Sequence, residues 1–316
     1  MERQTIAMVR SGAIAVALSL ILYRIAASST LFIVPLLFFA NKFRPKRLAL
    51  IPVGVVFLIL LGSQIVGLKE MLREASGIGP LLVGLYLPVS LLIGTGIWIE
   101  LDRMRMLVKL LASASFAAIT GFILVLWFSS GSQAALATAN IYEQMVEMVL
   151  PTLLGGQLPL GMSTQALFYA VVTVLKVGFL PIFIGQFGFS VLLSELLIHR
   201  SESTFQERMA HWKLPENSVW IFLGSWTIVL MTLLVEMPFL ESVAWNTALT
   251  VSLLYMVQGI SVVAAFMRRR NPRITSTRVF ILSFLLALLP GVNLIPLLGL
   301  PLLGVSETWI DYRKNR

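Results

Sequence analysis

The chain has 316 residues, of which 58% are hydrophobic and 12% are charged, and its mean hydropathy is +0.89. Soluble domains carry about a quarter charged residues, so this composition excludes an ordinary soluble protein and predicts a polytopic membrane protein. The formal charge of +9 fits the Lys and Arg enrichment of cytoplasmic loops in such proteins, and the absence of Cys excludes disulfides, thiolate metal sites and a Cys nucleophile.

The first apolar segment, residues 11–23, follows a short stretch that carries Arg3 and Arg10. A signal peptide begins in the same way, and residues 26–28 would then be its cleavage site. Because apolar segments continue to the C-terminus, we interpret residues 11–23 as a first membrane helix. The next apolar segment, residues 29–40, is short, and the two together predict a hairpin of short helices.

Longer apolar runs follow, and all but the marginal run 219–235 reach the roughly 20 residues that a spanning helix needs. These runs are residues 48–67, 79–99, 106–128, 166–199, 219–235, 243–267 and 279–304. Pro290-Gly291 and Pro296 divide the last run into pieces too short to cross about 30 Å alone. We therefore predict an all-α, polytopic integral membrane protein with about 8 to 10 membrane segments.

The distribution of Lys and Arg predicts the topology. The segment 129–165 contains no basic residue, so we place it outside the cytoplasm. Because successive membrane segments cross in opposite directions, the main basic clusters then lie on the cytoplasmic side. They are residues 42–47, 103–109, 200–213 and 268–278. A kinked crossing by the last run would put Arg313 outside, whereas a re-entrant hairpin keeps it inside, and the charge rule favours the hairpin.

Two polar elements divide the chain. Residues 133–150, with Met145 and Met148 on the apolar side, predict an extracytoplasmic helix, ended by Pro151, that lies on the outer surface as a lid or an interfacial helix. Residues 201–217 predict a cytoplasmic linker. We therefore expect a six-helix bundle over residues 1–200 and a C-terminal bundle of three or four segments over residues 218–316.

The sequence lacks the motifs of known catalytic sites. It contains no H-E-x-x-H, no G-x-S-x-G and no Walker A motif, and no spanning run holds paired carboxylates. His199 and His211 lie at the predicted cytoplasmic side, where a solvated position is the ordinary interpretation. We therefore expect no enzymatic activity, no metal site and no cofactor.

Lys176 lies well inside a spanning run, about 15 Å from its start at helical rise. A charge at that depth is costly and predicts a functional role, with a side chain that snorkels outward as the alternative. Gln186 projects in a similar direction on the same run, and Thr250 and Gln258 share a face of the run 243–267. We interpret these four residues as candidate ligand-binding residues of a polar cavity, and hydrogen bonding between helices is the alternative.

The run Arg268-Arg269-Arg270 is a candidate site for anionic lipid or for a cytoplasmic partner, and a stop-transfer anchor is the alternative. We expect no nucleic-acid partner, because neither aromatic interleaving nor a nucleic-acid-binding fold signature accompanies this run. The lipid bilayer itself and a membrane or cytoplasmic protein are the partners that the sequence predicts.

The C-terminal third carries several short motifs: Trp212-Lys213-Leu214-Pro215, Gln258-Gly259-Ile260-Ser261-Val262, Gly304 and Asp311-Tyr312-Arg313-Lys314. Together they resemble the YybS-like family of predicted bacterial membrane proteins, a family without an established activity. The resemblance implies a bacterial inner membrane and supplies no catalytic residues. In architecture alone, the first six helices also resemble the substrate-binding S components of energy-coupling factor transporters, although about three C-terminal helices are added and a vitamin-binding signature is missing.

Two hypotheses for function follow. In the first, the chain is a small-solute binding or transport subunit that takes an anionic solute in the predicted cavity, gated by the helix 133–150. In the second, it is a non-transporting scaffold or regulator whose cytoplasmic surfaces recruit partners, and a tightly packed interior would favour this hypothesis. A membrane enzyme acting on lipid is a distant third, because no acid, base or nucleophile set can be named.

Overall fold

The computed structural model describes residues 2–73, 79–153, 163–199, 202–235, 237–289 and 291–314. Within these ranges the chain is helical and contains no β-strand, which confirms the predicted all-α class. Six of the described helices are long and apolar enough to cross a membrane, and four shorter apolar helices accompany them. The total of 8 to 10 membrane segments stays a prediction.

The chain divides into two compact units, Met1–Ser194 and Glu195–Arg316. The described part of the predicted linker, residues 202–217, falls in the second unit. The physical reason is that its helix α8 (Ser203–Ala210) packs on helices from the C-terminal part of the chain.

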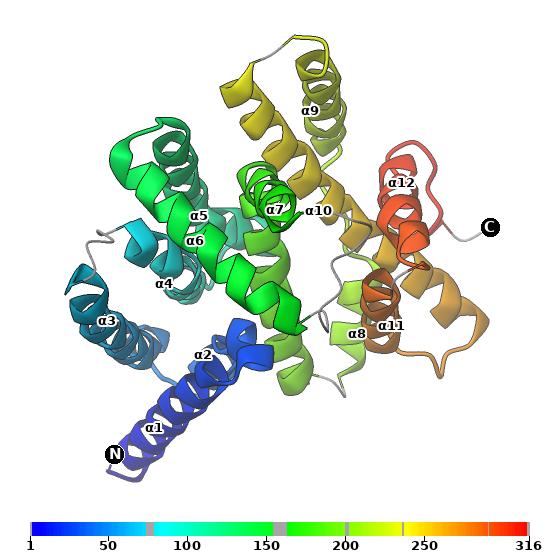
Figure 1. Ribbon diagram of the computed structural model, residues 1–316. Coiled ribbons are helices and arrows are strands. Elements are labelled where there is room, and N and C mark those ends of the chain that lie inside the picture. Colours follow the sequence, from blue (N-terminus) through cyan, green and yellow to red (C-terminus); the bar gives the residue numbers. More distant parts are fainter. Residues whose placement is uncertain are drawn as a thin grey trace. The chain divides into compact units, whose positions relative to one another are not determined.

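The helices of the first unit follow the predicted apolar runs, because a backbone in a bilayer has to satisfy its own hydrogen bonds. In chain order they are α1 (Glu2–Arg24), a 3-10 turn (Ala26–Leu31), α2 (Val34–Ala40), a second 3-10 turn (Lys46–Ala49), α3 (Leu50–Arg73), α4 (Gly79–Glu100), α5 (Met106–Ser129), α6 (Gln133–Leu153) and the first part of α7 (Thr164–His199) (Figure 1). Helices α1 and α2 pack on each other, as a hairpin requires.

Aromatic rings of α7 form part of the core of the first unit. Phe183 and Phe187 are fully buried and stack with their ring centroids 5.6 Å apart. Phe187 also meets the edge of Trp98 on α4 at 5.9 Å. A side chain at Gly121 on α5 would collide with the ring of Phe179, so this glycine makes room for that ring of α7 against α5.

Helix α6 is present as predicted, but it ends later than expected. It continues past Pro151 to Leu153, since one missing N–H near a helix end removes a single hydrogen bond. Its buried contacts come from Thr138, which fills the space beside Gly79, and from Tyr142, whose hydroxyl donates to the Pro80 carbonyl at 3.2 Å. The predicted apolar side is exposed, with Met148 70% accessible.

Helix α10 (Pro238–Arg270) is the central element of the second unit. The helices α8, α9 (Ser218–Thr232), α11 (Ser276–Leu288) and α12 (Leu300–Ser306) all pack on it (Figure 1). The last apolar run is broken as predicted: α11 ends at Leu288, and Gly291 has a φ of 85°, which glycine adopts readily. A π-helical turn, Ile295–Gly299, then leads into α12.

Two glycines let the backbones of α10 and α12 touch. A Cβ atom on Gly259 would overlap the carbonyl oxygen of Leu300, and one on Gly304 would overlap the carbonyl oxygen of Tyr255. Because Gly259 faces Leu300 while Tyr255 faces Gly304, the two helices run antiparallel at this crossing. No side chain larger than hydrogen fits at either glycine without separating the helices.

We predict that Gly259→Ala and Gly304→Ala each lower the melting temperature of the purified protein in detergent, because forcing a methyl group into a packed contact costs about 1–3 kcal/mol. Gly224→Ala is the matched control. Gly224 lies in α9 with open space around its Cα, so alanine there is neutral or stabilising through its higher helix propensity. Parent-like melting of Gly304→Ala would contradict the close crossing.

Candidate functional site

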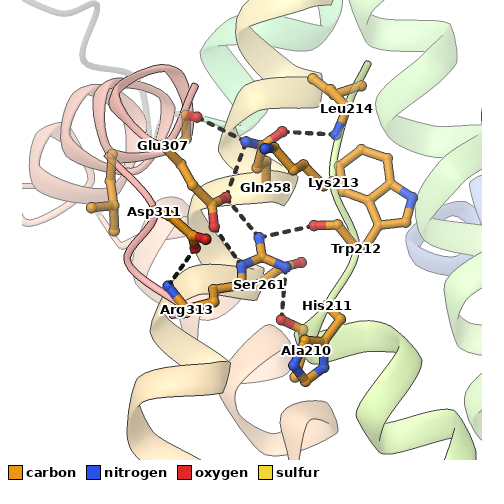
Figure 2. Close-up of polar contacts among 12 residues, drawn as sticks. Ala210, His211, Trp212, Lys213, Leu214, Gln258, Ser261, Glu307, Asp311 and Arg313 are labelled. Atoms are coloured by element: carbon orange, nitrogen blue, oxygen red, sulfur yellow. Dashed lines mark hydrogen bonds and ion pairs between the residues drawn. The ribbon is translucent and has the colours of Figure 1, made fainter. Parts of the chain in front are cut away.

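A buried ion pair joins the end of α12 to the C-terminal segment. The side chains of Glu307 and Arg313 are 2% and 9% exposed, respectively. The Arg313 Nε lies 2.6 Å from Glu307 Oε1, and the Arg313 Nη2 donates to Glu307 Oε2 at 2.8 Å (Figure 2). The Nη2 contact is a charged hydrogen bond, which is stronger than a neutral one, and the Nε contact adds a close approach of opposite charges.

The same guanidinium also holds the linker. Nη1 of Arg313 donates to the Ala210 carbonyl at 2.9 Å, and Nη2 donates to the Trp212 carbonyl at 3.0 Å. Ala210 is the last residue of α8, where carbonyls have no partner within the helix and where a cation is electrostatically favoured. Arg313 therefore caps α8 and holds the C-terminal segment against the part of the linker that follows this helix.

Gln258 of α10 completes the arrangement. Its Nε2 donates to Glu307 Oε2 and to the Gly304 carbonyl, both at 3.0 Å, while its Oε1 accepts the backbone N–H of Leu214 at 2.9 Å. Both amide hydrogens and the amide oxygen are thus engaged with protein groups. We name Gln258, Glu307 and Arg313, with the backbone groups that they bind, the Arg313 cluster.

Local structure places Arg313 for these contacts. The chain leaves α12 after Ser306 and turns, and Asp311 then accepts the backbone N–H of Arg313 through its Oδ1 at 3.1 Å. An Asp that bonds the N–H two residues on is a common turn-forming arrangement. As Figure 2 shows, this turn directs the Arg313 side chain between the Glu307 carboxylate and the linker.

Most of the residues that carry the family resemblance meet at this cluster. Trp212, Leu214, Gln258 and Arg313 contribute direct contacts, Asp311 holds the backbone of Arg313, and Gly259 lies at the helix crossing, whereas Pro215 is exposed. Glu307 was not predicted from the sequence. The pattern that could have indicated it is a carboxylate directly after a long apolar run, six residues before an arginine.

The four predicted ligand-binding residues are divided between the two units. Lys176 and Gln186 lie on the part of α7 in the first unit; Lys176 is half-buried, and Gln186 Nε2 donates to the Thr30 carbonyl at 3.0 Å. Thr250 and Gln258 lie on α10 in the second unit. The Thr250 hydroxyl is buried and has no hydrogen-bond partner within the described ranges. The cavity that would unite these residues stays a prediction.

Charged pairs of the first unit are more exposed. Lys46 Nζ lies 2.5 Å from Asp102 Oδ1, and Arg47 Nη2 lies 2.6 Å from Glu100 Oε1. These two ion pairs connect the turn Lys46–Ala49 to the end of α4. The hydrogen bond from Lys46 holds the pKa of Asp102 below its ordinary value. Across the described residues, no group of three or more His, Asp or Glu side chains is arranged to hold a metal ion.

Comparisons of the chain with protein-family models, with curated proteins and with solved structures find no match. The resemblances to the YybS-like family and to S components therefore stay predictions, and the site has to be interpreted from its own chemistry.

We predict that Glu307→Gln and Arg313→Met each destabilise the second unit strongly. Each variant leaves the other member of the buried ion pair as an unpaired charge, at a cost of about 3–5 kcal/mol. The measurement is thermal unfolding, with limited proteolysis at residues 211–217 as a local readout. The double variant should cost less than the sum of the two single variants, because the residues act as a unit.

Lys213→Met is the control for this series. Lys213 and Glu216 form a pair in the same linker at 3.8 Å, but their side chains are 42% and 78% exposed, so its loss should change stability little. Equal effects of Lys213→Met and Arg313→Met would contradict a dominant role for the buried pair.

Proposed function

We propose that the chain is a multi-pass protein of the bacterial inner membrane that acts as a non-transporting scaffold or regulator, and that its linker is the surface for a cytoplasmic protein partner. The observation that carries this proposal is the Arg313 cluster, which fixes a non-helical segment, residues 211–214, against α10 and the C-terminal segment. A segment held in one conformation before binding loses less conformational entropy when a partner docks.

The use of polar side chains also supports a scaffold. The amide groups of Gln186 and Gln258, two of the predicted ligand-binding residues, are bonded to protein carbonyls and, for Gln258, to a carboxylate and a backbone N–H. Displacing the bonds of Gln258 for a solute would leave buried protein groups unpaired, which costs free energy. Their role is therefore better explained by packing of the helices than by an open cavity.

The position of Arg313 supports a C-terminus on the same side as the linker. Its guanidinium binds carbonyls at residues 210 and 212, so the two segments lie together. Helix α11 has 13 residues, about 20 Å at helical rise, and is too short to cross the bilayer alone. If the linker is cytoplasmic, as its charge predicts, the C-terminal segment that carries Arg313 is cytoplasmic as well.

The outer side of the linker provides the docking surface. Lys213, Pro215, Glu216 and Asn217 are exposed, while Leu214 between them is buried. This alternation anchors the segment through its inner side and leaves charged and amide groups outside for a partner.

We predict that a photo-crosslinking amino acid at Glu216 forms a discrete protein adduct in cells. The adduct should weaken at least severalfold when Glu307→Gln releases the linker, provided that the variant is still inserted in the membrane. A crosslinker at Gln144, an exposed position of α6 on the predicted opposite side, is the control and should not form this adduct. Absence of an adduct at Glu216, or an adduct unaffected by Glu307→Gln, would contradict the proposal.

A second candidate function is binding of an anionic solute by the first unit. Lys176 favours it, because this side chain is half-buried eight residues into the apolar stretch Phe168–His199 of α7. A cation at that depth costs free energy, so its presence is typical of a residue with a role in binding or transport.

We predict different outcomes for Lys176→Met under the two functions. If Lys176 binds an anion, loss of one charged hydrogen bond should weaken binding roughly tenfold to a hundredfold, from about 1.5–3 kcal/mol. The measurement is the melting temperature of parent and variant across a panel of small anions, with Lys213→Met as control. If no anion stabilises the parent more than Lys176→Met, solute binding at Lys176 is excluded and the scaffold is favoured.

A further inference from the structure

The junction between α10 and α11 carries a cluster of arginines without acidic partners. Arg269, Arg270, Arg273 and Arg278 are exposed, and Arg268 is half-exposed. In the part of the chain that the structure describes, none of the five forms an ion pair with a carboxylate. Such a concentration of unpaired positive charge favours an anionic partner.

Helix α11 presents an apolar surface directly beside these arginines. Ile281, Leu282 and Leu285 are exposed and follow Arg278 by three, four and seven residues, so all four lie along one side of the helix. The opposite side is fixed within the second unit. There, the buried Ser276 hydroxyl donates to the Gln206 carbonyl of α8 at 2.6 Å.

A second bond holds α11 in this orientation, because the Thr277 backbone N–H donates to Gln206 Oε1 at 3.0 Å. The helix therefore cannot turn its exposed leucines inward without breaking contacts to α8. It begins at a cationic end and continues as an apolar surface, which is the order of chemical groups across one leaflet of an anionic membrane. Phe266 on α10, 63% exposed, adds apolar surface next to the arginines.

We propose that this surface is a binding site for anionic phospholipid, in which Arg269, Arg270, Arg273 and Arg278 contact headgroup phosphates while Ile281, Leu282 and Leu285 contact the acyl chains. Guanidinium groups bind phosphate oxygens through paired hydrogen bonds. A lipid explains the arginines and the apolar side of α11 with one ligand, whereas a soluble acidic partner would account for the arginines alone.

The experiment measures the melting temperature of the purified full chain in a neutral detergent during titration with phosphatidylglycerol, phosphatidylcholine or glycerol 3-phosphate. Phosphatidylglycerol should stabilise the parent, because a ligand that binds only the folded form raises the melting temperature. In the triple variant Arg269→Gln/Arg270→Gln/Arg273→Gln, the phosphatidylglycerol concentration that gives half of the stabilisation should rise on the order of a hundredfold. Each arginine near a membrane surface contributes roughly fivefold.

The double variant Arg103→Gln/Arg105→Gln is the control, because these arginines are also exposed and lie in the turn between α4 and α5, outside the proposed site. It should keep the parent's response. The triple Arg→Lys variant, which retains the charge, should recover part of the stabilisation and separates lipid binding from damage to folding.

Three outcomes would overturn the proposal. Equal stabilisation by phosphatidylcholine would show that headgroup charge is irrelevant. An equal loss in the control and in the triple Gln variant, or an unchanged response of the triple Gln variant, would show that the attraction is not local to this junction. Equal stabilisation by glycerol 3-phosphate would identify a site for soluble phosphate.

Discussion

Burial of the Arg313–Glu307 ion pair removes two charges from water, and the second unit is arranged around the partners that this pair requires. Such a pair is tolerated only when its geometry is good and its remaining donors and acceptors are bonded. Here the carbonyls of Ala210 and Trp212 accept from the guanidinium, and Gln258 donates to the carboxylate. The pair therefore constrains the linker, the central helix and the C-terminal segment together, although these segments are far apart in the sequence.

The cluster depends on the contact between α10 and α12. Because Gly259 and Gly304 have no side chains, the helix backbones touch, and the short α12 brings Glu307 within reach of Gln258. Small residues commonly allow close helix crossings in membranes, where the hydrophobic effect between helices is weak. The cluster in turn stabilises this crossing, because the Gln258 amide donates a hydrogen bond to the Gly304 carbonyl.

The two units use polar groups in different ways, and this difference bears on function. The core of the first unit relies on stacked rings such as Phe183 and Phe187, and its Lys46–Asp102 pair is 33% and 43% exposed. The second unit buries its ion pair and leaves the arginines at the α10–α11 junction unpaired among the described residues. A unit that pairs its buried charges internally and leaves arginines unpaired on its surface is suited to contacts made at that surface, in line with the proposed scaffold.

The sequence by itself determined the membrane class, the positions of the apolar helices and the break after Leu288, because these depend on local composition, helix length, proline and glycine. It also singled out Trp212 and Arg313, but without a physical role for either. Only the tertiary structure decided that Arg313 binds Glu307, and that α6 packs through Thr138 beside Gly79. Hydrophobic periodicity shows which side of a helix is apolar, whereas the partner of a polar group is set by packing between segments distant in the chain.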